Sequence, residues 1–118
     1  MDLGVALGWL GLAAVLASST LYAVNRLAPG LSEGYMRFHC YAGLASVAFT
    51  VLHAMYNWES LGGDWSGLTN LGLVLIIAGS GMLLRYVPNA GSYRFHSATL
   101  HSALVLALLV SLFFHVIG

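Results

Sequence analysis

The sequence predicts an all-α protein, a four-helix transmembrane bundle, and its composition and hydropathy pattern support that fold class. The 118 residues are 59% hydrophobic and 7% charged, whereas a soluble domain carries about 25% charged residues. The few charges leave four long uncharged runs, at 3–25, 38–58, 65–84 and 95–118. Each run has at least 20 residues, about the length of helix that crosses a hydrocarbon core of about 30 Å.

We expect the transmembrane helices at about 3–25, 36–58, 66–86 and 94–117, within a single membrane domain that covers residues 1–118. The connections between these helices contain residues that end helices and form turns. They are Pro29 and Gly30, then Gly62 and Gly63, then Pro88, Asn89 and Gly91. Short connections favour an antiparallel up-and-down bundle, in which the second and fourth helices run parallel.

The charge pattern excludes a nucleic-acid-binding protein and indicates an orientation. Four basic residues balance four acidic ones, so no basic surface is available for a phosphate backbone. The basic residues flank the first and third connections and are Arg26, Arg37, Arg85 and Arg94. By the positive-inside rule these connections are cytoplasmic and both termini lie outside. We therefore expect a multi-pass integral protein of a bacterial or archaeal inner membrane, in contact with lipid.

The first and third connections also resemble each other. Arg26-x-x-Pro29 leads to Gly34-x-x-Arg37-Phe38-His39, and Arg85-x-x-Pro88 leads to Gly91-x-x-Arg94-Phe95-His96. This internal repeat predicts two duplicated hairpins, related by a pseudo-twofold axis along the membrane normal.

Five histidines are the candidate functional residues of this apolar chain, because an imidazole in hydrocarbon is costly unless it is paired or ligated. His39 and His53 are 14 residues apart on the second expected helix, and His101 and His115 are 14 residues apart on the fourth. Fourteen helical residues return to within about 40° of the starting direction after a rise of about 21 Å. Each of the two helices therefore has two imidazoles on one face, one near each membrane surface.

These pairs predict two b haems with bis-histidine ligation. Because the two helices run parallel, His39 can meet His101 at the inner level, and His53 can meet His115 at the outer level. Haem iron accepts imidazole ligands, and bundle cores hold such cofactors between facing helices. A zinc site is disfavoured because imidazoles about 21 Å apart on one helix cannot enter one tetrahedron.

Small residues lie between the ligands of the second helix, at Gly43, Ser46 and Thr50. Small side chains leave room for the wide plate of a porphyrin, and we expect these residues beside the haems. The alternative explanation is that they let two membrane helices approach each other closely.

Three further residues are candidates near the inner haem. Arg37 and Arg94 are expected to pair with haem propionates, although the positive-inside rule alone also explains them. His96 lies 19 residues before His115 and does not match the spacing of 14. It is therefore expected to bind a propionate, to serve a quinone site or to cap a helix, but not to ligate iron.

The motifs His39-x13-His53 and His101-x13-His115 resemble the ligand helices of membrane dihaem b-type cytochromes, which include respiratory cytochrome b and the ferric-reductase-like transmembrane group. The segment from Arg37-Phe-His39 through His53-Ala-Met-Tyr56 is more similar to the second group. The resemblance covers the two ligand helices and implies two haems b that carry electrons across the bilayer. Ferric reductases usually have six helices and a flavin and nicotinamide module, whereas this sequence predicts four helices.

The predicted mechanism is electron transfer rather than bond chemistry, because six-coordinate iron has no open position for a substrate. We expect a small membrane cytochrome or a cytochrome b subunit of a larger complex, with a quinone or a redox protein as its partner. One alternative is a chlorophyll- or bacteriochlorophyll-binding subunit. Another is a quinol-dependent or metal-reducing oxidoreductase that acts at the outer haem. The residues expected beside such an outer site are Tyr56, Asn57, Trp58, Glu59 and Asp64.

Overall fold

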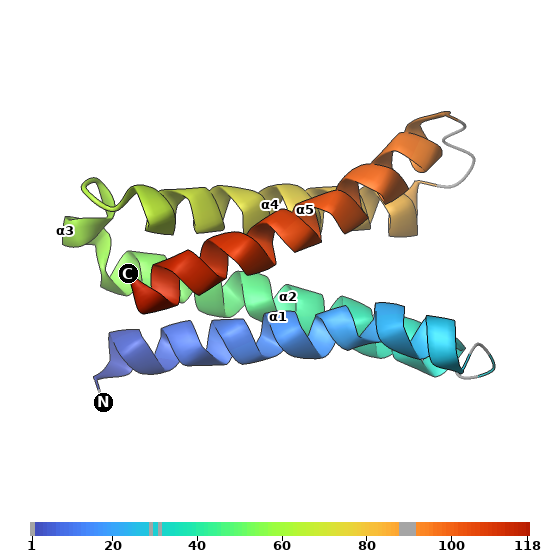
Figure 1. The fold of residues 1–118 in the computed structure, drawn as a ribbon, viewed down its shortest axis with the longest axis horizontal. Coiled ribbons are helices and arrows are strands. Elements are labelled where there is room, and N and C mark those ends of the chain that lie inside the picture. Colours follow the sequence, from blue (N-terminus) through green and yellow to red (C-terminus); the bar gives the residue numbers. More distant parts are fainter. Residues whose placement is uncertain (1, 29, 31, 88–91) are drawn as a thin grey trace. The chain divides into compact units, whose positions relative to one another are not determined.

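A computed structural model of the chain describes residues 2–28, 30, 32–87 and 92–118, without the side chains at 21–23, 25–26, 32–33 and 92–95. These residues form five helices and no strand (Figure 1). The helices are α1 (Leu3–Leu27), α2 (Ser32–Tyr56), α3 (Trp58–Leu61), α4 (Trp65–Tyr86) and α5 (Ser92–Ile117). The predicted all-α class with four long helices is confirmed, and these four are long and apolar enough to cross a membrane. The short helix α3 was not expected from the sequence.

The first and third long helices begin in the same way. The carboxylate of Asp2 accepts a hydrogen bond of 2.8 Å from the backbone N–H of Val5, at the start of α1. The carboxylate of Asp64 accepts one of 3.0 Å from the N–H of Gly67, at the start of α4. An aspartate at this position satisfies one of the N–H groups that the first turn of a helix leaves without a partner.

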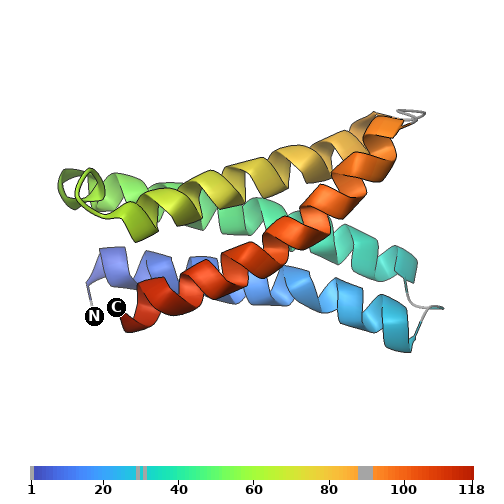
Figure 2. The same cartoon turned by 45° about the horizontal axis from the view of Figure 1, so that its top comes forward.

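The chain forms two compact units, Met1–Asn57 and Trp58–Gly118, which we call the first and second hairpin. In the first hairpin α1 packs against α2, and in the second α4 packs against α5 (Figures 1 and 2). Both pairs are antiparallel, because residues early in one helix meet residues late in the next. We call the end of a hairpin that carries the aspartate cap its cap end, and the opposite end its turn end.

Small residues bring α1 and α2 close together. Gly11, Val15 and Ser18 are buried on one face of α1. A Cβ atom on Gly11 would lie 3.4 Å from Thr50 Oγ1, and one on Gly43 would lie 3.6 Å from Ser18 Oγ. Such close approach is typical of membrane helices, whose association depends on van der Waals packing and interhelical hydrogen bonds.

The second hairpin has larger residues in its core. Val74 and Leu108 are buried, together with the polar residues Asn70, Ser80 and Ser97. Large apolar side chains are exposed on all four long helices, for example Leu106 at 68%. In a membrane these exposed faces contact lipid rather than water.

Candidate functional site

Two histidines of α2 bind the backbone of α1 through the same ring nitrogen. His39 Nδ1 lies 2.8 Å from the carbonyl oxygen of Ser18 and 2.9 Å from its Oγ. His53 Nδ1 lies 2.7 Å from the carbonyl oxygen of Gly4. In both rings Nδ1 is therefore the atom that forms hydrogen bonds with the preceding helix of the hairpin.

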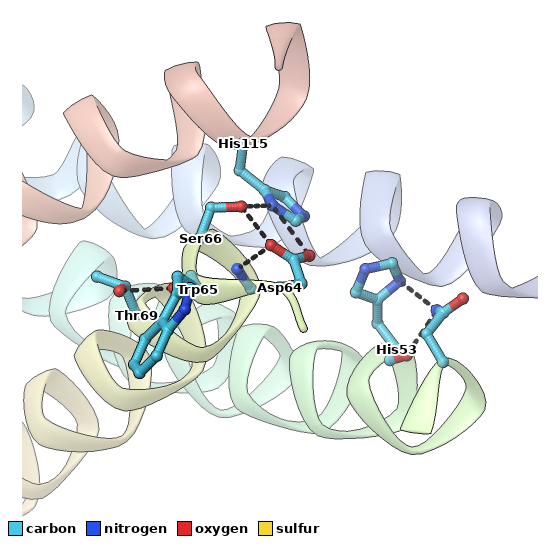
Figure 3. A network of polar contacts seen from close by, with 8 residues as sticks. His53, Asp64, Trp65, Ser66, Thr69 and His115 are labelled. Carbon is cyan, nitrogen blue, oxygen red and sulfur yellow. Dashed lines mark hydrogen bonds and ion pairs between the residues drawn. The ribbon is translucent and has the colours of Figure 1, made fainter. Parts of the chain in front are cut away.

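The two expected ligands of α5 make the corresponding contacts with α4. His101 Nδ1 lies 2.9 Å from Ser80 Oγ and 3.0 Å from the carbonyl oxygen of Ile77. His115 Nδ1 lies 2.7 Å from Ser66 Oγ (Figure 3). All four imidazoles are partly buried. The second hairpin thus repeats the arrangement of the first. Both of its imidazoles contact a serine hydroxyl, whereas in the first hairpin one imidazole contacts a serine and the other a glycine carbonyl oxygen.

The hydrogen-bond partners assign the proton of the turn-end imidazoles to Nδ1. A carbonyl oxygen can only accept a hydrogen bond, and a hydroxyl group has a single proton to donate. The Ser18 hydroxyl donates to the His39 carbonyl oxygen at 3.2 Å, and the Ser80 hydroxyl donates to the Ile77 carbonyl oxygen at 2.8 Å. Neither hydroxyl has a proton left for imidazole, so Nδ1 must be the donor at His39 and His101.

The same argument holds at the cap ends. The Ser66 hydroxyl donates to Asp64 Oδ1 at 2.7 Å, so it accepts from His115 Nδ1. At His53 the partner is the Gly4 carbonyl oxygen. That oxygen can only accept, so His53 Nδ1 is the donor. The amide nitrogen of Asn57 also lies 3.4 Å from His53 Nδ1, and it donates to the His53 carbonyl oxygen at 2.8 Å. In all four rings Nδ1 therefore carries the proton, and Nε2 is the unprotonated ring nitrogen.

The contacts show a repeat that differs from the one in the connecting sequence. The pairs Ser18–His39 and Ser80–His101 both span 21 residues, and both members are shifted by 62. The contacts of His53 with residue 4 and of His115 with residue 66 both span 49 residues, with the same shift. In its contacts His101 is thus the counterpart of His39. The exposed His96, which the Arg-Phe-His echo aligns with His39, is not.

The acceptors that hold the imidazoles were missed from the sequence. Ser18 and Ser80 precede their histidines by the same 21 residues, and this equal spacing was the signal that could have found them. Gly4 could not have been found in this way, because it contributes its backbone oxygen, which every residue has.

Glycines lie directly beside two of the imidazoles. A Cβ atom on Gly8 would lie 3.0 Å from Cε1 of His53, and one on Gly81 would lie 3.1 Å from Cε1 of His101. Real Cβ atoms are rarely this close to a neighbour. A larger residue would not fit at these two positions unless the ring moved, because the imidazole occupies the space that a side chain would take.

Two of the three small residues expected beside the haems contact α1 within their own hairpin. Gly43 lies against Ser18, and Thr50 lies against Gly11. Ser46 is 6% exposed, and its hydroxyl donates to the Gly43 carbonyl oxygen at 2.6 Å. Close packing against α1 thus accounts for the small residues Gly43 and Thr50, and the placement of all three residues beside a haem stays a prediction.

Arg37 is exposed on α2, and the side chain of Arg94 lies outside the described residues. The expected pairing of these two arginines with propionates therefore also stays a prediction.

The cap end of the second hairpin holds a chain of hydrogen bonds that runs from Asp64 to His115 (Figure 3). Asp64 Oδ1 accepts from the Ser66 hydroxyl at 2.7 Å and from the Gly67 N–H at 3.0 Å. Asp64 Oδ2 lies 3.9 Å from His115 Nδ1. The Ser66 hydroxyl and the Gly67 N–H lower the pKa of Asp64 below its ordinary value, and His115 acts in the same direction. The carboxylate is therefore ionised near neutral pH.

Asn70 lies one helical turn beyond Ser66 on α4 and is 5% exposed. Its amide oxygen and nitrogen are both buried without a hydrogen-bond partner among the described residues. The residue at the same position of the first hairpin is Gly8. A buried amide without a partner costs about 1–3 kcal/mol of stability, so Asn70 lowers the stability of the α4–α5 pair.

Two other features of the described residues bear on ligand binding. No three His, Cys, Asp or Glu side chains among them gather as a metal site. An open groove of about 620 Å³ lies on the second hairpin. It is lined by Trp65, Ser66, Thr69, Leu106, Ala107, Val110, Ser111 and Phe114. Its mainly apolar walls are those of a surface that contacts lipid.

Comparisons with protein-family models, with curated proteins and with solved structures found no match for this chain.

Proposed function

We propose that this protein is a membrane dihaem b-type cytochrome that transfers electrons across the bilayer. One observation supports the proposal above all others. Four imidazoles, two in each hairpin, donate Nδ1–H to the preceding helix, so the unprotonated ring nitrogen is Nε2, the atom through which an imidazole in this tautomer would ligate haem iron. A metal-ligating histidine almost always donates its other ring N–H to a carbonyl, a carboxylate or a similar acceptor, which fixes its tautomer and orientation.

We assign His39 and His101 to the haem at the turn ends, and His53 and His115 to the haem at the cap ends. The equal spacing of the two histidines in each hairpin supports this pairing, because two hairpins that cross the membrane in the same direction would present their ligands at matching depths.

Bound haem supplies a one-electron couple at its iron. The protein's own residues determine how strongly the imidazoles bind and how they are oriented. The acceptors on α1 and α4 hold each ring in one tautomer, which raises the basicity of Nε2. Gly8 and Gly81 leave the space in which two of the rings lie. The apolar helices surround the site with a low dielectric, which is one of the factors that tune a haem potential.

The exposed apolar faces of the four long helices suit a protein surrounded by lipid. The redox partner in this proposal is a quinone in the bilayer or a redox protein, and the chain acts either alone or as the cytochrome b subunit of a larger complex. The arginine-flanked connections lie on the cytoplasmic side, as the positive-inside rule requires. The cap ends and both chain ends then lie on the outer side.

The test is the haem content of the purified protein, expressed in a host that makes haem. We expect two non-covalent haems b per chain by pyridine haemochrome assay and the reduced spectrum of low-spin bis-histidine haem. A single haem, no haem or the spectrum of a chlorophyll would contradict the proposal. Electron transfer is then tested with the protein in sealed vesicles, where an external reductant should reduce an acceptor trapped inside.

A further inference from the structure

The cap ends of the two hairpins differ in the atoms that surround their histidines. Both carry an aspartate cap, at Asp2 and Asp64. The residue two places later is Gly4 in the first hairpin and Ser66 in the second. A glycine has no hydroxyl group, so it cannot link the cap carboxylate to an imidazole through its side chain. Ser66 does link them.

The link runs in one direction from proton donor to acceptor. His115 Nδ1–H donates to Ser66 Oγ at 2.7 Å, and the Ser66 hydroxyl donates to Asp64 Oδ1 at 2.7 Å. The second carboxylate oxygen lies 3.9 Å from His115 Nδ1. His115 is 27% exposed and Asp64 is 42% exposed, so the carboxylate lies at the surface while the imidazole is mostly covered.

A hydrogen-bonded carboxylate increases the electron density of an imidazole. It polarises the Nδ1–H bond, makes Nε2 a stronger donor and favours the more positive, oxidised state of a ligated iron. Hydrogen bonds that include an ionised group are about twice as strong as neutral ones, and a chain of hydrogen bonds is polarised along its length. A neutral backbone carbonyl, as at His53, acts in the same sense but more weakly.

We propose that Asp64 is a positioning residue that acts through Ser66 on His115 and lowers the reduction potential of the haem at the cap ends. This inference rests on the proposed function. The acceptors at the turn ends are the neutral oxygens of Ser18, Ile77 and Ser80. Asp64 therefore makes the two haems unequal, and its contribution favours electron flow from the cap-end haem to the turn-end haem.

The first experiment is a redox titration of the haem-loaded wild type and of two matched variants, Asp64→Asn and Asp2→Asn. Asparagine caps a helix about as well as aspartate, so both changes remove a charge and keep the cap. We expect Asp64→Asn to raise the reduction potential of one haem by up to about 59 mV, which corresponds to a tenfold change in its one-electron reduction equilibrium. Asp2→Asn should leave both potentials within a small fraction of that shift. Equal shifts in the two variants, or no shift in either, would overturn the inference.

Ser66→Ala provides the second variant, because it removes the linking hydroxyl and leaves the charge of Asp64. It should raise the same potential as Asp64→Asn. If Asp64→Asn fails to load haem, an unchanged potential in Ser66→Ala is the result that overturns the inference.

A measurement without haem separates this inference from the proposed function. In cofactor-free protein with labelled histidine, the Nδ1 proton resonance of His115 should move upfield in Asp64→Asn, because its hydrogen bond weakens, and stay in place in Asp2→Asn. A wild type that binds no haem would contradict the proposed function, while this resonance would still report on the chain from Asp64 to His115. An unchanged resonance in Asp64→Asn would refute the chain itself.

Discussion

In the first hairpin the imidazole of His53 lies against Gly8 and donates to a backbone oxygen, whereas in the second hairpin His115 donates to a serine that is bound to a carboxylate. Each position of the first hairpin corresponds to the position 62 residues later in the second, and the histidines match in this alignment. Two neighbouring positions do not match, because the first hairpin has Gly4 and Gly8 where the second has Ser66 and Asn70. A helix pair can thus keep the position of a histidine while the chemistry around that histidine changes. Position depends on where two backbones meet, and the chemistry depends on single side chains.

The largest effects are expected from the histidines themselves. His39→Ala or His101→Ala should remove the turn-end haem, and His53→Ala or His115→Ala should remove the cap-end haem, because each change deletes one of two axial ligands. His96→Ala is the control and should keep both haems. Haem content and the reduced spectrum measure the outcome. Loss of a haem in His96→Ala together with its retention in His101→Ala would show that the two hairpins are not equivalent in the way their contacts indicate.

The next effects concern the glycines beside the rings. Gly8→Val and Gly81→Val should displace the imidazoles of His53 and His101, because the added Cβ would already lie 3.0 Å and 3.1 Å from a ring atom. Overpacking of this kind costs about 1–3 kcal/mol, and we expect a lower melting temperature and weaker haem retention. Gly79→Val is the matched control on α4, since a Cβ there has no neighbour within 4 Å. Equal losses in all three variants would indicate a general effect of valine instead.

Removal of the serine hydroxyls should distinguish the two ends of the second hairpin. Ser66→Ala removes the hydroxyl that accepts from His115, and loss of such a partner weakens metal binding by about 10–100-fold. Ser80→Ala and Ser18→Ala should have smaller effects, because the carbonyl oxygens of Ile77 and Ser18 still accept from His101 and His39. The measurement is the rate of haem transfer to apomyoglobin. A larger effect of Ser80→Ala than of Ser66→Ala would contradict this order.

A smaller effect is expected at Asn70, the polar counterpart of Gly8. Leucine has the same branched shape as asparagine but no polar atoms, so Asn70→Leu should remove the cost of an amide without a partner and raise the melting temperature. Thr69→Val is the control on the same helix, because Thr69 is exposed and its hydroxyl donates to the Trp65 carbonyl oxygen at 2.7 Å. If Asn70→Leu instead destabilises the haem-loaded protein alone, the amide binds a group that only the loaded protein contains.

The smallest effect is the pH dependence that Asp64 contributes. The Ser66 hydroxyl, the Gly67 N–H and His115 lower the pKa of Asp64 in the folded protein, so its stabilising contribution is present above the unfolded pKa of about 3.9. It is lost as the pH falls through the lowered folded value. The stability difference between the wild type and Asp64→Asn should thus be constant above about pH 5 and shrink below pH 4. A difference that is as large at pH 3 as at pH 7 would contradict this assignment.

The all-α class and the four membrane-length helices could be predicted from the sequence, because hydropathy and the scarcity of charge depend on composition along the chain and not on contacts. The sequence also predicted that His39 and His53 share a face of α2, and that His101 and His115 share a face of α5, because helical periodicity follows from backbone geometry. It did not predict α3, which begins at Trp58, where the second long helix was expected to end.

The hydrogen-bond partners of the imidazoles could be seen only in the packing of the helices. The acceptors on α1 and α4 come from residues 21, 24 or 49 positions away in the chain, and three of them are backbone oxygens that no sequence pattern distinguishes, those of Ser18, Gly4 and Ile77. The tertiary structure also showed that Gly43 and Thr50 meet α1 and that Asp64 belongs to the surroundings of His115. The physical reason is that helix formation is local, whereas a hydrogen bond between helices depends on how closely two backbones approach and at what register.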